Sequence, residues 1–317
     1  MSLLVLFRTR LEWCNYTCRY CPWNATARRV PAEAFHEDES RLRRILDRVA
    51  QLPDAVEFFI TPKAEYLVLP YWREAVVRLL ALPQVERVTI QTNLSFDVAD
   101  FLDSVDAAKL ALWTTYHPSE VSEHELDNLH AKWRLLQERG VTFSVGIVGT
   151  HENLPHLQRL RRRLDSRVYL WVNAYQREPN YYTAEQLTVI RGVDPWFDLN
   201  NQYFPSRGRP CTAGLRAVYL DDEGDLRRCF FVGEVIGNLF RDGWRRLTAP
   251  RPCPRETCHC YVGHMHIVEL NFRSIYGRNL AVRVPNDFGK HIGARRVSEE
   301  GTSLADAAGS AGFVRNS

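Results

Sequence analysis

The chain has 317 residues, of which 45% are apolar and 25% are charged, and its formal net charge is +3. This composition is typical of a globular protein with one large domain, or with a large and a small one. The small net charge gives no reason to expect a nucleic-acid partner, and no apolar run reaches the roughly 18 residues of a membrane span. The N-terminal apolar segment is too short for a signal peptide and lacks a small-residue cleavage site.

Six apolar, β-rich runs alternate with longer amphipathic segments. Strands are predicted at Leu3–Phe7, Val56–Ile60, Val88–Thr92, Leu110–Tyr116, Val141–Val148 and Val168–Val172. Helices are predicted near Glu37–Gln51, Tyr71–Leu82, Val98–Asp106, Glu120–Arg139, Leu154–Leu164 and Thr183–Arg191. This alternation predicts βα units around a parallel sheet. An eight-unit barrel needs roughly 250 residues, and here the sixth unit ends near Gly192. We therefore expect an α/β fold, a partial (β/α)6 TIM-type barrel that is open on one side.

The chain changes character after Pro205. Ala217–Leu220 and Leu226–Phe230 flank an acidic turn, which predicts a β-hairpin. The final residues are rich in Ser, Ala and Gly, which is typical of disorder. The expected division is a barrel, a small cysteine-rich domain with the hairpin, a C-terminal extension and a disordered tail, at residues 1–205, 206–270, 271–298 and 299–317.

The eight cysteines fall into two groups. In a chain without a secretory leader they indicate metal or redox chemistry in a reducing cytoplasm, not a disulfide scaffold. The first group, Cys14, Cys18 and Cys21, directly follows the first strand, at the end of the barrel where barrel enzymes keep their sites. Three thiolates can bind three irons of a 4Fe–4S cluster and leave the fourth iron open to a chelating ligand. A closed zinc site would need a fourth ligand, and no nearby His or Cys supplies one.

The spacing of these cysteines, with Tyr20 just before the last of them, resembles the motif of the radical S-adenosylmethionine (SAM) superfamily. The resemblance implies a partial six-unit barrel and a catalytic 4Fe–4S cluster on Cys14, Cys18 and Cys21. It implies that SAM chelates the open iron and is cleaved by an electron from the cluster, so that a 5′-deoxyadenosyl radical abstracts hydrogen from a substrate. An electron donor such as flavodoxin or ferredoxin is implied as a partner.

The resemblance extends to residues at the ends of later strands. Glu65 stands where the superfamily carries Gly-Gly-Glu, whose carboxylate contacts the SAM ammonium, although Lys63 and Ala64 replace the two glycines. A carboxylate paired with a cation is the expected arrangement. The cofactor-binding residues implied in this way are Tyr20, Glu65, Gln91, Asn93, Thr115, Ser144, Ile147 and Asn173.

Three of these residues lie on the last two predicted strands. Ile147 would pack on the adenine, Ser144 would offer a hydroxyl, and Asn173 would face the ribose or the adenine. The alternative for each polar strand end is that it caps a helix and binds no ligand. We interpret His117 and His151, which follow the fourth and fifth strands, as surface residues and not as acid–base groups.

The second group of cysteines surrounds the predicted hairpin and continues after it. This arrangement resembles the twitch domain, a shortened SPASM extension in which such cysteines bind an auxiliary 4Fe–4S cluster. The expected metal ligands are Cys211, Cys229, Cys253 and either Cys258 or Cys260. The alternatives are free thiols, or a tetrahedral zinc site that also uses His259, His264 and His266.

The function expected from this resemblance is radical SAM chemistry, an oxidative or modifying step on a small molecule with help from an auxiliary cluster. The stretches LALWTTYHP and CPRETCHC resemble a functionally uncharacterised bacterial family of the superfamily. This resemblance does not indicate a substrate. The first alternative is maturation of a ribosomally made peptide, which we place second because the cluster motif begins at Cys14 and leaves no room for a leader-binding domain before it. The other alternative is that the protein is a non-catalytic iron–sulfur or zinc protein.

Overall fold

The computed structural model describes residues 2–23, 30–175 and 178–288. The expected tail at 299–317, and the last part of the extension expected at 271–298, lie outside the described residues. No helix in the described part of the chain combines the length and apolarity that crossing a membrane requires.

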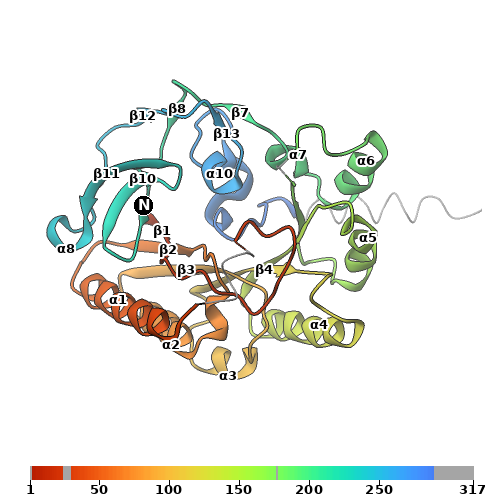
Figure 1. The fold of residues 1–317 in the computed structure, drawn as a ribbon, viewed down its shortest axis with the longest axis horizontal. Coiled ribbons are helices and arrows are strands. Elements are labelled where there is room, and N and C mark those ends of the chain that lie inside the picture. Colours follow the sequence, from red (N-terminus) through yellow and green to blue (C-terminus); the bar gives the residue numbers. More distant parts are fainter. Residues whose placement is uncertain (1, 24–29, 176–177, 289–317) are drawn as a thin grey trace, which may run out of the picture.

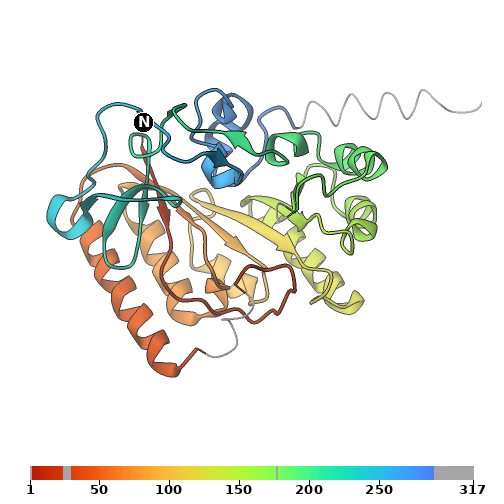
Figure 2. The same cartoon turned by 45° about the horizontal axis from the view of Figure 1, so that its top comes forward.

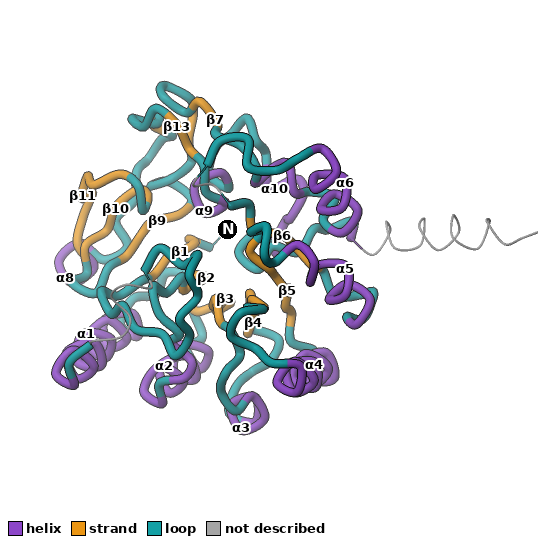
Figure 3. The backbone as a smooth tube through the Cα atoms, turned by 45° about the vertical axis from the view of Figure 1, so that its right-hand side comes forward, coloured by secondary structure: helices purple, strands orange, loops and turns teal. Residues whose placement is uncertain are grey.

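One mixed sheet of nine strands forms the centre of the molecule, in the order β11-β10-β9-β1-β2-β3-β4-β5-β6. Strands β1 to β6 pair in parallel and in sequence order. They span Leu3–Phe7, Val56–Ile60, Val85–Thr92, Leu110–Tyr116, Thr142–Val148 and Leu170–Asn173. Figure 3 shows these strands as an arc with α1 to α5 on its outer side. The predicted partial barrel of βα units is confirmed.

The helices that follow the strands cover the outer face of the sheet (Figure 1). Helices α1 to α7 span Ala32–Ala50, Pro70–Ala81, Val98–Asp103, Glu123–Glu138, Leu154–Arg163, Ala184–Val193 and Phe197–Asn200, and a short 3-10 turn spans Tyr66–Val68. Helix α1 begins five residues before the predicted start, directly after Pro31. Helix α4 begins three residues later than predicted because Ser122 and Glu125 form a capping box.

Side chains alternate across the strands and build two separate cores. The outward side chains, such as Val5, Phe58 and Leu112, pack against the helices in the larger core. The inward ones, such as Leu4 and Trp113, pack in a second core on the concave side of the sheet. The barrel interior is therefore apolar along its middle, and polar inward residues remain at the strand ends.

The C-terminal segment supplies the other half of this second core. It contains α9 (Tyr261–His264), α10 (Phe272–Tyr276) and a 3-10 turn at Gly277–Asn279, and Figure 3 shows α9 and α10 on the concave side of the sheet. We call this segment, from α9 to Arg283, the plug. The buried side chain of Arg283 lies at its end, with its guanidinium 4.6 Å from the ring centroids of both Trp171 and Tyr261. The plug closes the interior of the barrel beneath the strand ends.

The predicted hairpin belongs to the central sheet, because β9 (Ala217–Leu220) pairs in parallel with β1. It continues through β10 (Asp225–Cys229) into a third strand, β11 (Val232–Asn238), which the sequence analysis did not predict. Helix α8 (Leu239–Asp242) follows it, and strands from before and after the hairpin form two small two-stranded sheets, β8–β12 and β7–β13. These short strands are Phe204–Pro205, Pro210–Cys211, Arg251–Pro252 and Thr257–Cys258. The sheet is thus continuous across the expected boundary at residues 205 and 206.

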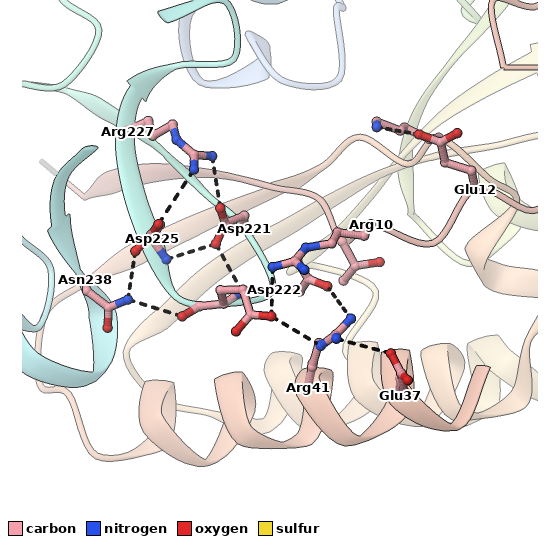
Figure 4. A network of polar contacts seen from close by, with 12 residues as sticks. Arg10, Glu12, Glu37, Arg41, Asp221, Asp222, Asp225, Arg227 and Asn238 are labelled. Carbon is pink, nitrogen blue, oxygen red and sulfur yellow. Dashed lines mark hydrogen bonds and ion pairs between the residues drawn. The ribbon is translucent and has the colours of Figure 1, made fainter. Parts of the chain in front are cut away.

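A network of ion pairs fastens the hairpin turn to the barrel (Figure 4). The Asp222 carboxylate, only 1% exposed, lies 3.2 Å from Nε of Arg10 and 3.4 Å from Nη1 of Arg41 on α1. Glu223 lies 2.7 Å from Nη2 of Arg10. Asp221 shapes the turn by accepting hydrogen bonds from the backbone N–H groups of Glu223 and Asp225. These contacts hold the hairpin turn against the barrel, which fixes the second group of cysteines relative to β1.

Gly146 on β5 packs directly against Trp171 of the second core, which gives a test of the fold. A Cβ at Gly146 would overlap the indole of Trp171. We expect Gly146→Ala to lower the free energy of unfolding by about 1–3 kcal/mol, because overpacking forces the indole to move. The measurement is the denaturant midpoint of the protein under anaerobic conditions.

The matched control is Gly192→Ala on α6, where nothing lies within 4 Å of the added Cβ. Alanine in a helix is more favourable than glycine by about 0.5–1 kcal/mol, so this variant should be unchanged or slightly more stable. Equal effects of the two substitutions would contradict the packing described here.

Candidate functional site

The first group of cysteines lies in the loop after β1, which is dark red in Figure 2. Cys14, Cys18 and Cys21 line one open pocket together with side chains from the ends of β2, β3 and β4. The pocket encloses about 690 Å³, counting space open to solvent. Of the cofactor-binding residues expected from sequence, it brings together Glu65, Gln91, Asn93 and Thr115.

Hydrogen bonds from the neighbouring strand ends hold this loop in place. The Asn15 side chain donates to Ser95 Oγ at 2.8 Å and accepts from Asn93 Nδ2 at 3.1 Å. The backbone N–H of Thr17 donates to Glu120 Oε2 at 3.0 Å. The loop is therefore tied to the turns after β3 and β4, and its cysteines are held at the mouth of the barrel.

Glu65 is a buried carboxylate without a cation. It is 3% exposed, and it accepts hydrogen bonds from Thr92 Oγ1 at 2.7 Å and from the backbone N–H of Asn93 at 2.6 Å. Burial raises the pKa of Glu65 to about 7, and these hydrogen bonds oppose the shift. Within the described residues no Lys, Arg or His nitrogen pairs with it, because Lys63 turns to Glu12 at 2.5 Å instead. A cationic group bound in the pocket would offset the cost of burying this charge.

The thiols at this site are buried or half-buried. Burial raises the pKa of Cys14 to about 12 and that of Cys18 to about 11. Such thiols stay protonated near neutral pH unless a metal stabilises the thiolate, which is the form that binds iron. Three neighbouring thiols beside a carboxylate that has no cation fit an iron–sulfur cluster with a cationic ligand.

His117 does not lie on the surface as the sequence analysis expected. It is half-buried after β4, and its ring is enclosed by Tyr16 and Tyr20. Its Nδ1 lies 2.8 Å from the Tyr20 hydroxyl and 3.3 Å from Cys18 Sγ. Desolvation lowers the pKa of His117 to about 4. His151, by contrast, is exposed as expected and stacks on Tyr181.

Four of the expected cofactor-binding residues do not line the pocket, and the first of them, Tyr20, lies against His117. Ser144 faces the plug, where its hydroxyl donates to the Val282 carbonyl at 2.6 Å. Ile147 points to the helices in the outer core because it has the opposite strand parity to Ser144. The Asn173 side chain accepts from Asn200 Nδ2 at 3.4 Å. The plug, which the sequence did not reveal, covers Ser144, whereas Ile147 lies on the outer face and Asn173 lies against α7.

The second group of cysteines surrounds a separate cavity of about 500 Å³. Cys211, Cys229, Cys253 and Cys258 all line it, and Cys260 does not. Burial raises the pKa of Cys229 and of Cys258 to about 12. A Cβ at Gly263 would lie 2.5 Å from Cys258 Sγ, so only glycine lets α9 approach this thiol so closely.

Arg228 on β10 is a cavity residue that the sequence analysis missed. It is 4% exposed, and its Nη2 and Nη1 donate to the carbonyls of Arg251 at 2.8 Å and Pro252 at 3.2 Å. Its Nε is buried with no partner among the described residues. The alternation of β10 was the available signal, since Arg228 occupies a buried position two residues after the buried Leu226. A buried guanidinium without a carboxylate favours an anionic occupant.

The histidines of the zinc alternative are arranged differently. His264 and His266 are buried outside the cavity lining, and His264 Nε2 lies 2.8 Å from the Cys258 carbonyl oxygen. Only His259 lines the cavity. Throughout residues 2–23, 30–175 and 178–288, no three Cys, His, Asp or Glu side chains converge closely enough to hold a single metal ion.

Comparison with known proteins gives a likeness of fold. No family model matches the sequence, and no curated protein matches it either. The structure of a histidine-tagged anSMEcpe with bound AdoMet has a TM-score of 0.52 and 13% identity, and the match covers 93% of this chain and 99% of that chain. AdoMet is S-adenosylmethionine.

Two other solved structures match less of the chain. SuiB from Streptococcus suis has a TM-score of 0.49 and 13% identity, with 77% of this chain and 64% of SuiB covered. BtrN in complex with AdoMet and 2-DOIA has a TM-score of 0.40 and 15% identity, with 77% of this chain and 80% of BtrN covered. All three are radical SAM enzymes. Because the match to anSMEcpe spans nearly the whole of both chains, this protein has the fold of the radical SAM enzymes.

Proposed function

We propose that this protein is a radical SAM enzyme. The observation that carries the proposal is the pocket in which three thiols meet a buried carboxylate that has no cation. When bound there, a 4Fe–4S cluster would supply the electron that splits SAM, and the resulting 5′-deoxyadenosyl radical would abstract hydrogen from the substrate. The likeness of fold supports the same assignment.

Each protein residue has a simple role in this proposal. Cys14, Cys18 and Cys21 would bind three irons, and Glu65 would pair with the SAM amino group. Asn93 orients Glu65 through its backbone N–H. The plug seals the interior of the barrel beneath the pocket, so the cofactor would be shielded from water on that side.

We propose a small molecule as the substrate, consistent with this closed interior. Trp113, Trp171 and Tyr261 fill the lumen, so the free space is confined to the mouth beside the cysteine loop. The alternative is a peptide whose modified residue alone enters the mouth. An oxidative step would also need the second site as an electron acceptor.

We propose that this second site binds an auxiliary 4Fe–4S cluster through Cys211, Cys229, Cys253 and Cys258. Four thiols around one cavity match the four-cysteine ligation of such clusters. Arg228 would offset the negative charge of the cluster and its thiolates.

The iron content tests the two-cluster proposal. Anaerobically reconstituted wild type should contain about 8 irons per chain, and the Cys14→Ala/Cys18→Ala/Cys21→Ala variant about 4. A count of about 4 that falls to near 0, with zinc retained in both proteins, would contradict the auxiliary cluster. Wild type that takes up no iron would contradict the proposed function.

The ligand set of the second site can be tested with two neighbouring thiols. Cys258→Ala should lower the total iron below about 8 per chain, because it removes one of four cluster ligands. Cys260→Ala is the matched control and should keep about 8 irons, since its thiol does not line the cavity. Mössbauer spectra and iron analysis measure both variants, and the reverse pattern would make Cys260 the ligand.

The role of Glu65 predicts how SAM affinity depends on pH. Only the ionised carboxylate pairs with the SAM cation, so wild-type affinity should fall tenfold per pH unit below about 7 and level off above it. Glu65→Gln should bind SAM roughly 10- to 100-fold more weakly, the range for loss of a charged hydrogen bond. Its affinity should not vary with pH in this range.

Calorimetry of SAM binding between pH 5.5 and 8 makes this measurement. Glu86→Gln, a substitution of an exposed glutamate at the far end of β3, is the control and should leave the wild-type profile unchanged. A Glu65→Gln profile that matches wild type would exclude Glu65 as the partner of the SAM amino group.

A further inference from the structure

The turn after β4 contacts the cysteine loop, which follows β1, at two neighbouring residues. Glu120 Oε2 accepts from the backbone N–H and the hydroxyl of Thr17, at 3.0 and 3.3 Å. Cys18 is the next residue of the loop after Thr17, and its Sγ lies 3.3 Å from Nδ1 of His117. The imidazole is therefore aimed at a sulfur that the proposed function assigns to the cluster, and this inference rests on that function.

The packing around His117 leaves the ring little freedom. Its plane lies nearly parallel to that of Tyr20, with 7° between the rings, and Tyr16 meets it edge-on with ring centroids 5.6 Å apart. The Tyr20 hydroxyl lies 2.8 Å from the same Nδ1. One nitrogen thus faces both a sulfur and a hydroxyl, and its protonation decides whether it donates a hydrogen bond to one of them or accepts one.

Iron binding by Cys18 would favour one of the two tautomers of His117. A free Cys18 thiol can donate to an unprotonated Nδ1. A thiolate that binds iron has no proton to donate, so an unprotonated Nδ1 at 3.3 Å would set two lone pairs against each other. A proton on Nδ1 converts this repulsion into an N–H···S hydrogen bond, and the Tyr20 hydroxyl can then donate to the sulfur as well.

We propose that His117 donates its Nδ1 proton to the Cys18 sulfur and so raises the reduction potential of the cluster. Reduction adds one electron, which increases the negative charge on the cluster and its thiolates. A donor on a ligand sulfur stabilises the reduced form more than the oxidised form, which is a known determinant of iron–sulfur potentials. His117 is thus a positioning residue that acts on the cluster through Cys18.

The test is an anaerobic redox titration followed by EPR, using the signal that changes when SAM is added. His117→Phe keeps a planar ring but has no N–H donor. It should lower the equilibrium constant for reduction about tenfold, which is a fall of 59 mV for one electron. His117→Asn, whose amide can place an N–H near the position of Nδ1, should restore most of the wild-type potential. His117→Gln, whose amide reaches further, should restore less.

His151→Phe is the matched control, since His151 follows β5, stacks on Tyr181 and is exposed; its potential should equal that of wild type. An unchanged potential in His117→Phe with full iron content would overturn the inference while leaving the proposed function intact. If His117→Phe binds no iron, the Asn and Gln variants decide, and equal potentials in these two would overturn it. Wild type without any SAM-sensitive signal would instead contradict the proposed function.

Discussion

The two-residue period of the parallel strands is the constraint on which the rest of this molecule depends. Because successive side chains point to opposite faces, β1 to β6 must bury two apolar surfaces at once. The helices cover the outer surface, and the C-terminal plug covers the inner one. Most polar inward side chains then lie where the strands end, and Ser144, within β5, is hydrogen-bonded to the plug. The pocket at the cysteine loop is a consequence of this arrangement, since it is the one end of the lumen that the described plug does not reach.

Buried charges without a partner mark both candidate sites. Glu65 has no cation and Arg228 no carboxylate within hydrogen-bonding distance in the described part of the chain. An isolated buried charge is costly, so it persists where a ligand compensates it. The signs are opposite, which agrees with a cationic ligand at the first site and an anionic cluster at the second. Ion pairs elsewhere, such as Asp222 with Arg10 and Arg41, are complete within the protein and serve the fold.

The pairing of β9 with β1 fixes the position of the second site relative to the first. The cysteine loop leaves the end of β1, and Cys229 lies on β10, two strands away in the same sheet. Arg8, the residue after β1, donates to the Thr61 carbonyl at 2.5 Å, and its guanidinium lies 4.3 Å from the Phe230 ring centroid. The spacing between the sites is therefore set by backbone pairing and not by a flexible linker, as electron transfer between two clusters would require.

The sequence by itself determined the parallel βα alternation of β1 to β6, the approximate positions of these strands and the place of the first cysteine group. Leu3–Phe7, Val56–Ile60 and Leu110–Tyr116 were predicted with the observed bounds, because hydrophobic period and length are local properties. Only the tertiary structure decided which side chains reach the sites. It turned Ser144 to the plug, brought His117 to Cys18 and separated Cys258 from Cys260. The first two outcomes depend on contacts between segments about 100 residues or more apart. The third depends on how the loop with Cys258 and Cys260 packs against the hairpin. No local sequence pattern encodes these contacts.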